Sequence, residues 1–201
     1  MTLSIPCRTF VRLVGASLQT DEQEAKNRVF LRSLRLERRD NNLYAVASNS
    51  WIMAIELLGP NAGEDAAFVI QLTDALLAQC ELEQTLDGIL FVNPDNSVHT
   101  TFGFSLAGAV IPDEWPDWKQ IVNRGAATKR KGSVVFNNNT SRLLKTAPSG
   151  HMVFPPVMNS DLPIICRDPY DENWIGVFMS IDVLTGSERP IPPATKPEWL
   201  K

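Results

Sequence analysis

Residues 110–118 read VIPDEWPDW, and this stretch separates two parts of the chain. Val110 and Ile111 have the apolar character of a strand end, and an acidic turn follows them. Proline fixes its own backbone angle, and flat aromatic rings on either side of such a turn can seal a seam between structural units. Trp115, Pro116 and Trp118 meet this description, so the stretch predicts a boundary between units near residue 118.

The residues before this boundary show the same order of elements twice. The apolar periodicity and turn residues predict two β-α-β-β-β units, at 1–58 and 66–111. In the first unit, a strand at 3–5 and a helix at 6–17 precede strands at 29–37, 43–48 and 51–58. In the second, a strand at 68–72 and a helix at 74–80, capped by Thr73, precede strands at 88–92, 97–102 and 105–111.

The residues after the boundary predict a third, shorter round. A polar and basic linker is expected at 119–132 and a third unit at 133–184. That unit has a strand at 133–136, a helix ending at Ala147, and strands at 151–157, 163–167 and 174–181. The proline-rich tail, 185–201, is expected to be extended or loose. Three rounds of about sixty residues predict an α+β fold, with helices on one side of antiparallel sheets.

The turn at 115–118 resembles one found in the bacterial DNA polymerase III β subunit, the sliding clamp. Members of that family end a domain with a strand and an acidic aromatic-Pro-Asp-aromatic turn, and Trp-Pro-Asp-Trp is similar to it. Residues 42–54, 68–77 and 174–181 also resemble family segments. The resemblance implies DNA-clamp-like repeats: one full clamp domain at 1–118, half of a second at 133–184, and a small, divergent phage- or mobile-element-like member.

The sequence departs from the family pattern at two places. Ser50, Trp51 and Ile52 stand where the family prefers Gly, His and Arg, and Ser180 replaces a proline of the closing strand. These changes affect the hairpin and the strand that, in clamps, receive partner peptides.

The resemblance implies a non-enzymatic role in DNA replication, as a processivity or recruitment factor. The implied partners are double-stranded DNA, bound without sequence preference, and DNA polymerase or other clamp-binding peptides. Unpaired strands at the end of a half domain favour a homo-oligomer. The alternative is a clamp-fold regulator or adaptor that binds a protein and does not encircle DNA.

In clamps the helices line the central hole, so basic residues on helices are the candidates for contacts with phosphates. The predicted DNA-binding set is Arg8, Arg12, Arg124, Lys129, Arg130, Lys131, Arg142 and Lys145. A solvated loop is an equal alternative for residues 129–131. The helix that begins at Asp74 carries no basic residue, which favours the adaptor hypothesis.

A peptide groove is the second candidate site. By position, the resemblance places its lining at Trp51, Ile52, Met53, Trp115, Pro116, Trp118, Met179 and Ile181. Aromatic and methionine side chains suit an adaptable pocket, but they equally suit packing between units.

The composition limits the other classes of function. A net charge of −4 gives no overall attraction to nucleic acid, so any contact with DNA requires a local basic patch. The three cysteines are widely separated and predict reduced thiols in a cytoplasmic protein, with no metal site and no cofactor. No segment suits a bilayer, and no catalytic motif accompanies His99 or His151.

Overall fold

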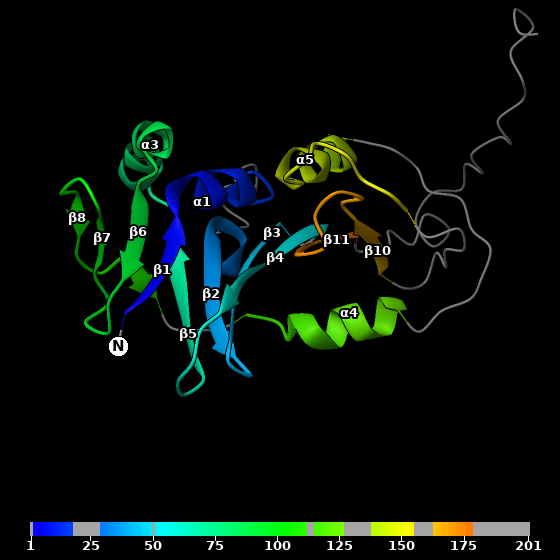
Figure 1. Cartoon of the computed structure of the whole chain (residues 1–201), viewed down its shortest axis with the longest axis horizontal. Coiled ribbons are helices and arrows are strands. Elements are labelled where there is room, and N and C mark those ends of the chain that lie inside the picture. The colour runs from blue at the N-terminus through cyan, green and yellow to red at the C-terminus, as the bar shows by residue number, and fades with distance from the viewer. Residues whose placement is uncertain are drawn as a thin grey trace, which may run out of the picture.

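The computed structural model describes residues 2–17, 29–49, 51–111, 115–126, 138–154 and 163–178. Antiparallel sheets carry helices α1 (Cys7–Val14), α3 (Asp74–Glu83) and α5 (Asn138–Thr146) on one side, and helix α4 (Trp118–Ala126) lies on the opposite side (Figure 1). The architecture is therefore α+β, as the sequence predicts.

The first two β-α-β-β-β units are present. The first contains β1 (Leu3–Pro6), α1, the short 3₁₀ helix η1 (Val29–Arg32), β2 (Ser33–Arg39), β3 (Asn42–Ser48) and β4 (Ile52–Pro60). The second contains β5 (Ala66–Gln71), α3, the 3₁₀ turn η2 (Gln84–Leu86), β6 (Ile89–Val92), β7 (Val98–Thr100), β8 (Ser105–Leu106) and the additional strand β9 (Val110–Ile111). The described part of the third contains α5, β10 (Ile164–Arg167) and β11 (Trp174–Phe178).

The first two units exchange their first strands. One sheet has the order β1-β6-β7-β8, so β1 of the first unit lies beside strands of the second. The other sheet has the order β10-β11-β4-β3-β2-β5-β9, so β5 of the second unit pairs with β2 of the first. The register places Leu3 opposite Val92, and Leu36 opposite Phe68. Because of this exchange, neither unit can complete its sheet alone.

The third unit joins the first along a continuous antiparallel ladder. Strand β11 pairs with β4, with Ile52 opposite Phe178 and Met53 opposite Val177. We call this junction the β4–β11 seam. It extends the larger sheet to seven strands.

Alternation along the strands divides the core into two layers. Ala45, Ala47 and Ala54 belong to the cluster under α1, α3 and α5, where small side chains allow the helices to approach the sheet. Val46, Met53 and Ile55 face the other way and form a second cluster with Trp115 and Trp118. The period of two thus supplies apolar side chains to both faces of the sheet.

Local signals explain where the first helices begin. Pro6 precedes the first turn of α1, where a residue without an amide hydrogen is tolerated. The hydroxyl of Thr73 accepts a hydrogen bond of 3.2 Å from the Leu76 amide and caps α3. The predicted cap is therefore confirmed, although α3 continues to Glu83 and not only to residue 80.

Several predicted elements differ from the structure. The second strand begins at Ser33, because Val29–Arg32 form a 3₁₀ helix. The single strand expected at 105–111 is two strands in different sheets, separated by a turn in which Gly108 has φ +68°. In 151–157, the described residues 151–154 form one isolated bridge, Val153 to Arg167, in place of a strand.

The linker expected at 119–132 is wrong in its described part, which is helix α4. The Asp117 side chain accepts hydrogen bonds from the amides of Lys119 and Gln120 and so caps this helix. The strand predicted at 133–136 and the tail at 185–201 lie outside the described residues. The division into domains at 1–118 and 133–184 remains a prediction.

Candidate functional site

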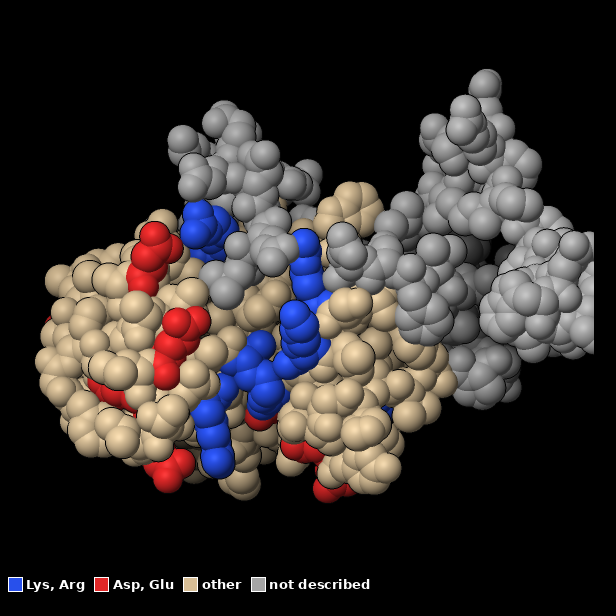
Figure 2. Space-filling view, turned by 90° about the horizontal axis from the view of Figure 1, so that it is seen from above, with Lys and Arg blue, Asp and Glu red and all other residues tan. Residues whose placement is uncertain are grey.

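Basic side chains gather on the side of the molecule that carries α1, α3 and α5. Seen from above this face, lysine and arginine side chains form a row across its middle (Figure 2). Arg8 on α1 and Lys145 on α5 are exposed, and Arg142 on α5 is half-buried. The helices of two units thus bring three of the predicted DNA-binding residues to one face.

Arg12, also on α1, is engaged within the chain. Its guanidinium donates hydrogen bonds to the Glu56 carboxylate on β4 and to the Thr146 carbonyl at the end of α5. Burial raises the pKa of Glu56, and the Arg12 charge only partly opposes this effect. Arg12 therefore connects the first unit to the third across the β4–β11 seam.

The other predicted DNA-binding residues lie elsewhere. Arg124 is exposed on α4, which Figure 1 shows on the opposite side of the sheet from α1 and α5. A surface that contacts DNA through α1 and α5 does not include it. Lys129, Arg130 and Lys131 lie outside the described residues.

The surface over helix α3 is acidic and apolar, unlike the basic surface over α1 and α5. Asp74 and Glu81 are exposed there, and Asp87 follows in the turn after η2. Leu82 is also exposed. The helical face is therefore basic over α1 and α5, and acidic and apolar over α3.

The hairpin and the closing strand of the predicted peptide groove lie side by side. Since Ile52 is opposite Phe178 in the β4–β11 ladder, the hairpin residue Trp51 stands at the same end of the seam as the end of β11. Asn49 forms the turn by accepting hydrogen bonds from the amides of Trp51 and Ile52, at 3.1 and 3.0 Å. Trp51 is 47% exposed, and Met179 and Ile181 lie outside the described residues.

Most of the other described residues that were predicted to line the peptide groove are buried. Met53, Trp115 and Trp118 are buried together with Val177 in the cluster on the outer face of the seam. Ile52 points the other way and is buried under the helices. Pro116 is half-buried. Of the described candidates, Trp51 is the one with a largely exposed side chain, while Met53 and the two tryptophans pack the seam.

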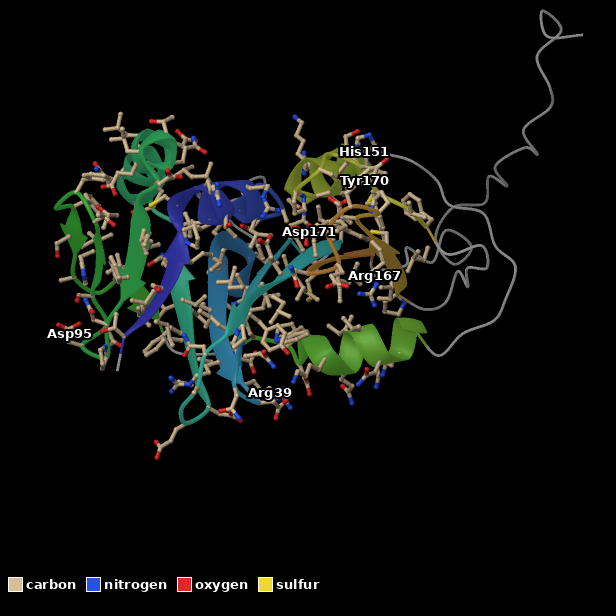
Figure 3. The ribbon with its side chains drawn as sticks, in the orientation of Figure 1. Arg39, Asp95, His151, Arg167, Tyr170 and Asp171 are labelled. Carbon is tan, nitrogen blue, oxygen red and sulfur yellow. The ribbon has the colours of Figure 1, made fainter. Side chains whose placement is uncertain are left out.

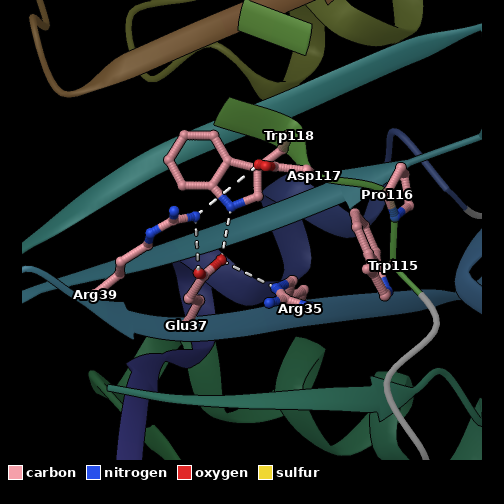
Figure 4. A pocket seen from close by; sticks show the side chains of 7 residues that line it. All are labelled: Arg35, Glu37, Arg39, Trp115, Pro116, Asp117 and Trp118. Atoms are coloured by element: carbon pink, nitrogen blue, oxygen red, sulfur yellow. Dashed lines mark hydrogen bonds and ion pairs between the residues drawn. The ribbon is translucent and has the colours of Figure 1, made fainter. Parts of the chain in front are cut away.

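A buried glutamate fixes the tryptophan turn to the sheet. Glu37 on β2 accepts hydrogen bonds from Trp118 Nε1 at 2.7 Å and from Arg35 Nε at 3.0 Å (Figure 4). The Arg39 Nη1 atom lies 3.7 Å from Glu37 Oε1 and 3.9 Å from Asp117 Oδ1. Trp115 Nε1 donates to the Ser33 hydroxyl at 3.2 Å. The indole N–H groups of Trp115 and Trp118 therefore both have partners, which fixes the turn to the sheet.

A small hollow of about 180 Å³ lies beside this turn. Its walls are Arg35, Glu37, Arg39, Trp115, Pro116, Asp117 and Trp118. Next to it, the Lys119 ammonium lies 2.7 Å from the Asp40 carboxylate and 5.4 Å from the centre of the Tyr44 ring. The hydrogen bond and charge of Lys119 hold the pKa of Asp40 below its ordinary value.

Sequence reasoning missed Glu37 and the inward role of Arg12. Glu37 looked like the polar face of a half-exposed strand, whereas α4 and its turn cover it. The Asp117 cap and the apolar residues at helical spacing after it, Trp118, Ile121 and Val122, were the available signal for that helix.

The titratable side chains of the described residues do not converge on one site. Asp95 lies at one end of the molecule, whereas His151 and Tyr170 lie beside α5 at the other (Figure 3). Burial raises the pKa of Cys166 to about 12 and also raises the pKa values of Cys7 and Cys80, which makes these thiols poor nucleophiles. Within the described ranges, no group of three metal-ligating side chains occurs, and no helix has the length and apolar character to cross a membrane.

Comparison with solved structures identifies the architecture. The DNA polymerase III β subunit of Pseudomonas aeruginosa superposes with a TM-score of 0.62 and 13% identity, over 90% of this chain and 66% of that one. The chain has the sliding-clamp fold.

Other clamps agree with this result. The β subunit of Thermotoga maritima gives a TM-score of 0.62 at 16% identity, and a putative β subunit of Eubacterium rectale gives 0.64 at 9%. The chain spans 65–66% of the length of these proteins. No family model and no curated protein matches the sequence. Clamp architecture is therefore shared at only 9–16% sequence identity.

Proposed function

We propose that this chain is a sliding-clamp-like factor of DNA replication, which tethers partner proteins to DNA without catalysis. The observation that carries the proposal is the shared basic face of α1 and α5, built on a clamp fold. Arg8 and Lys145 are exposed there, from units joined by one continuous sheet. Charges on rigid helices can contact phosphates without reading bases, which suits a protein that must move along DNA.

Tethering requires contacts that are numerous, weak and independent of sequence. The net charge of −4 keeps most of the surface unattractive to DNA, so binding would be confined to the basic row. Partner proteins would dock at the end of the β4–β11 seam, where Trp51 is exposed beside the end of β11. A polymerase peptide with apolar anchors is the proposed occupant. A phage or mobile-element origin remains part of this proposal.

The first test is retention on DNA. Light scattering with and without primed circular DNA measures the mass and the binding of the same sample. The proposal predicts complexes that are retained on circles, released on linearisation and weakened by salt. Binding that is equal on linear and circular DNA would contradict topological tethering, although it would leave the phosphate contact.

Charge reversal tests whether the basic surface of α1 and α5 contacts DNA. Arg8→Glu combined with Lys145→Glu should weaken DNA binding and lower the salt dependence, by about one unit of slope per lost phosphate contact. Arg124→Glu is the matched control, because α4 lies on the opposite side of the sheet (Figure 1). An equal loss in the control would show that attraction is not specific to the helical face.

The peptide site has its own test. Trp51→Ala should abolish binding of a synthetic clamp-binding peptide from a bacterial DNA polymerase while the far-ultraviolet dichroism stays unchanged. Tyr170→Ala removes another exposed aromatic ring and should have no effect. Unfolding of the Trp51 variant, or unchanged peptide binding, would refute the assignment.

A clamp-fold adaptor that does not encircle DNA is the second candidate. The exposed Asp74 and Glu81 on α3 favour it, since an anionic helix on the DNA-facing side repels phosphates. This candidate predicts peptide binding through Trp51 with no DNA retention at about 50 mM salt, where phosphate contacts are strong.

A further inference from the structure

Helix α3 buries a glutamate and exposes the leucine next to it. Glu83 is 1% exposed, whereas Leu82 is 65% exposed. Burial of a carboxylate costs free energy unless hydrogen bonds compensate it, and an exposed leucine forgoes the gain from burial. One carboxylate oxygen of Glu83, Oε2, is buried without a hydrogen-bond partner among the described residues. The order of apolar and polar residues at 82–83 is thus the reverse of the order that burial alone favours.

Contacts on the inner side of α3 fix this orientation. The Glu83 carboxylate accepts hydrogen bonds from the Thr100 hydroxyl on β7 and from Gln79 Nε2, the latter at 2.8 Å. Leu76 and Cys80 lie on the same side of the helix and are fully buried in the core. Because these contacts hold α3 against the rest of the chain, the helix cannot turn to bury Leu82. Its outer face is therefore a fixed surface.

Apolar residues follow one another along this outer face. Ala75, Ala78, Leu82 and Leu86 are all exposed, and their spacings of three, four and four residues place them on one side of the helix. We call these four residues the α3 patch. Leu86 is 58% exposed, so the two leucines offer large apolar anchors, while the two alanines allow a second helix to approach closely. Contiguous apolar residues on a folded surface mark sites of association.

The charges around the α3 patch all have the same sign. Asp74, Glu81 and Asp87 are exposed beside it, and residues 40–118, which include the whole second unit, contain no lysine or arginine. On the helical face, acidic side chains stand to the left of the row of basic ones (Figure 2). The α3 patch is therefore an apolar surface with an acidic rim, and it suits a partner that is apolar at its centre and positive at its margin.

We propose that the α3 patch binds a basic amphipathic helix of a partner protein. The apolar side of that helix packs on Leu82 and Leu86, and its lysine and arginine side chains pair with Asp74, Glu81 and Asp87. This role goes beyond the proposed function, because neither Trp51 nor the basic row of α1 and α5 takes part in it.

The acidic rim favours this occupant over other partners that an apolar surface could take. Anionic lipid headgroups and DNA phosphates are repelled by carboxylates, so neither a membrane surface nor nucleic acid complements the patch. A second α3 patch would bring carboxylates against carboxylates, which is also unfavourable. A basic helix satisfies both the apolar centre and the charged margin of the patch.

Fluorescence anisotropy with a model peptide tests the proposal. The probe is a labelled peptide of about 18 leucine and lysine residues, ordered so that the helix has one apolar face. It should bind the full chain saturably, with a Kd on the order of 10 μM as expected for a small interface, and more weakly as salt is added. A peptide of the same composition in scrambled order should bind about tenfold more weakly. Equal binding of the two peptides, or no saturation at about 1 mM chain, would overturn the proposal.

Two pairs of substitutions separate the apolar anchors from the charged rim. Leu82→Glu with Leu86→Glu makes the chain more negative, so attraction by charge alone predicts tighter binding of the peptide. The proposal predicts the opposite, a loss of about tenfold. Far-ultraviolet dichroism checks that this variant is folded. Unchanged or tighter binding by the folded variant would refute the assignment.

The rim has a matched control. Glu81→Lys with Asp87→Lys should lower the affinity for the peptide about tenfold and remove most of its salt dependence. Glu64→Lys with Glu172→Lys changes the net charge equally at exposed positions on other elements and should keep most of the affinity. Equal losses in the two variants would show that the peptide responds to net charge and not to the α3 patch. This comparison decides the matter if the leucine variant unfolds.

Other occupants of the α3 patch are tested without the peptide. Sedimentation velocity should give the same mass for the wild-type chain and the leucine variant, and phosphatidylglycerol vesicles should not carry the chain down with them. A lower mass in the variant would assign the patch to a second copy of the chain, and sedimentation with the vesicles would assign it to a membrane surface. Either result would overturn the proposal. Because these experiments contain no DNA and no polymerase peptide, their failure is distinguishable from failure of the proposed function.

Discussion

Strands β4 and β8 occupy the same place in their units, yet within the described residues β4 has its outer edge paired, with β11, and β8 does not. On the helical side of β4, Arg12 connects Glu56 to the end of α5. On the outer side, Met53 and Val177 are covered by Trp115 and Trp118. No strand of the described residues pairs with the outer edge of β8.

This contrast shows that the β-α-β-β-β unit does not by itself decide whether the outer edge of its last strand is paired. The helices of both units bury residues at the same spacing: Phe10, Val14 and Ser17 in the first unit, and Leu76, Cys80 and Glu83 in the second. What differs, within the described ranges, is the structure beyond the last strand: the third unit pairs with β4, and α4 covers one face of that junction. Four changes would break or sharpen the comparison.

The largest effect is expected from the outer face of the sealed seam. Trp118→Ala should lower the free energy of unfolding by about 4 kcal/mol, because it leaves a cavity in the cluster and removes a donor from buried Glu37. Urea denaturation measures the loss. Trp51→Ala, in an exposed hairpin, should cost less than about 1 kcal/mol. Equal losses of unfolding free energy in the two variants would show that the cluster around Trp118 does not stabilise the β4–β11 seam.

A methyl group in the closing strand should be nearly as damaging. A Cβ on Gly176 would lie 2.5 Å from both Cys166 Sγ and Trp174 Cη2, so Gly176→Ala should cost about 3 kcal/mol through overpacking. Gly103 has φ +97° and no neighbour within 4 Å of its Cβ position. Gly103→Ala should therefore cost only about 1 kcal/mol of backbone strain. Thermal unfolding of the two variants should rank them in this order, and a reversed rank would contradict the packing argument.

Removal of the arginine bridge should have an intermediate effect. Arg12→Ala leaves the Glu56 carboxylate and the Thr146 carbonyl without their donor, and since the pair is partly exposed we expect a loss of about 2 kcal/mol. Arg8→Ala on the same helix should change stability by less than about 0.5 kcal/mol. Guanidinium denaturation of both variants measures the difference, and an unchanged Arg12 variant would mean that the bridge does not stabilise the seam.

The smallest effect concerns pH. Burial raises the pKa of Glu56 above its ordinary value of 4.5, so the folded chain binds this proton more tightly than the unfolded chain. Its contribution to stability is therefore full below pH 4.5 and falls as the pH rises through the raised pKa. Relative to Glu56→Gln, the wild-type chain should lose stability between pH 4 and pH 7. A relative gain over that range would show that attraction to Arg12 outweighs burial.

Local features of the fold could be read from the sequence. The Thr73 cap, the helical spacing of Phe10 and Leu13, and the strand alternation at 43–48 all depend on neighbours within a few residues. The resemblance carried by Trp-Pro-Asp-Trp led to the clamp fold that the solved structures share. The two predicted sites could be read less completely. Arg12 was expected to contact DNA but is hydrogen-bonded to Glu56 and Thr146, and Ile52 was expected to line the peptide groove but is buried under the helices.

The sequence by itself determined the α+β class and most elements of the first two units, because caps and periodicity act over one or two turns of the chain; it did not determine helix α4 or the division of 105–111 into two strands. Only the tertiary structure decided that the units exchange their first strands, that Glu37 is buried under Trp118, and that β4 is covered while β8 is open. These outcomes depend on pairings between residues far apart in the sequence, such as Leu36 with Phe68, Leu3 with Val92 and Met53 with Val177. The free energy of such pairings comes from shape and burial between distant segments, which no local pattern encodes.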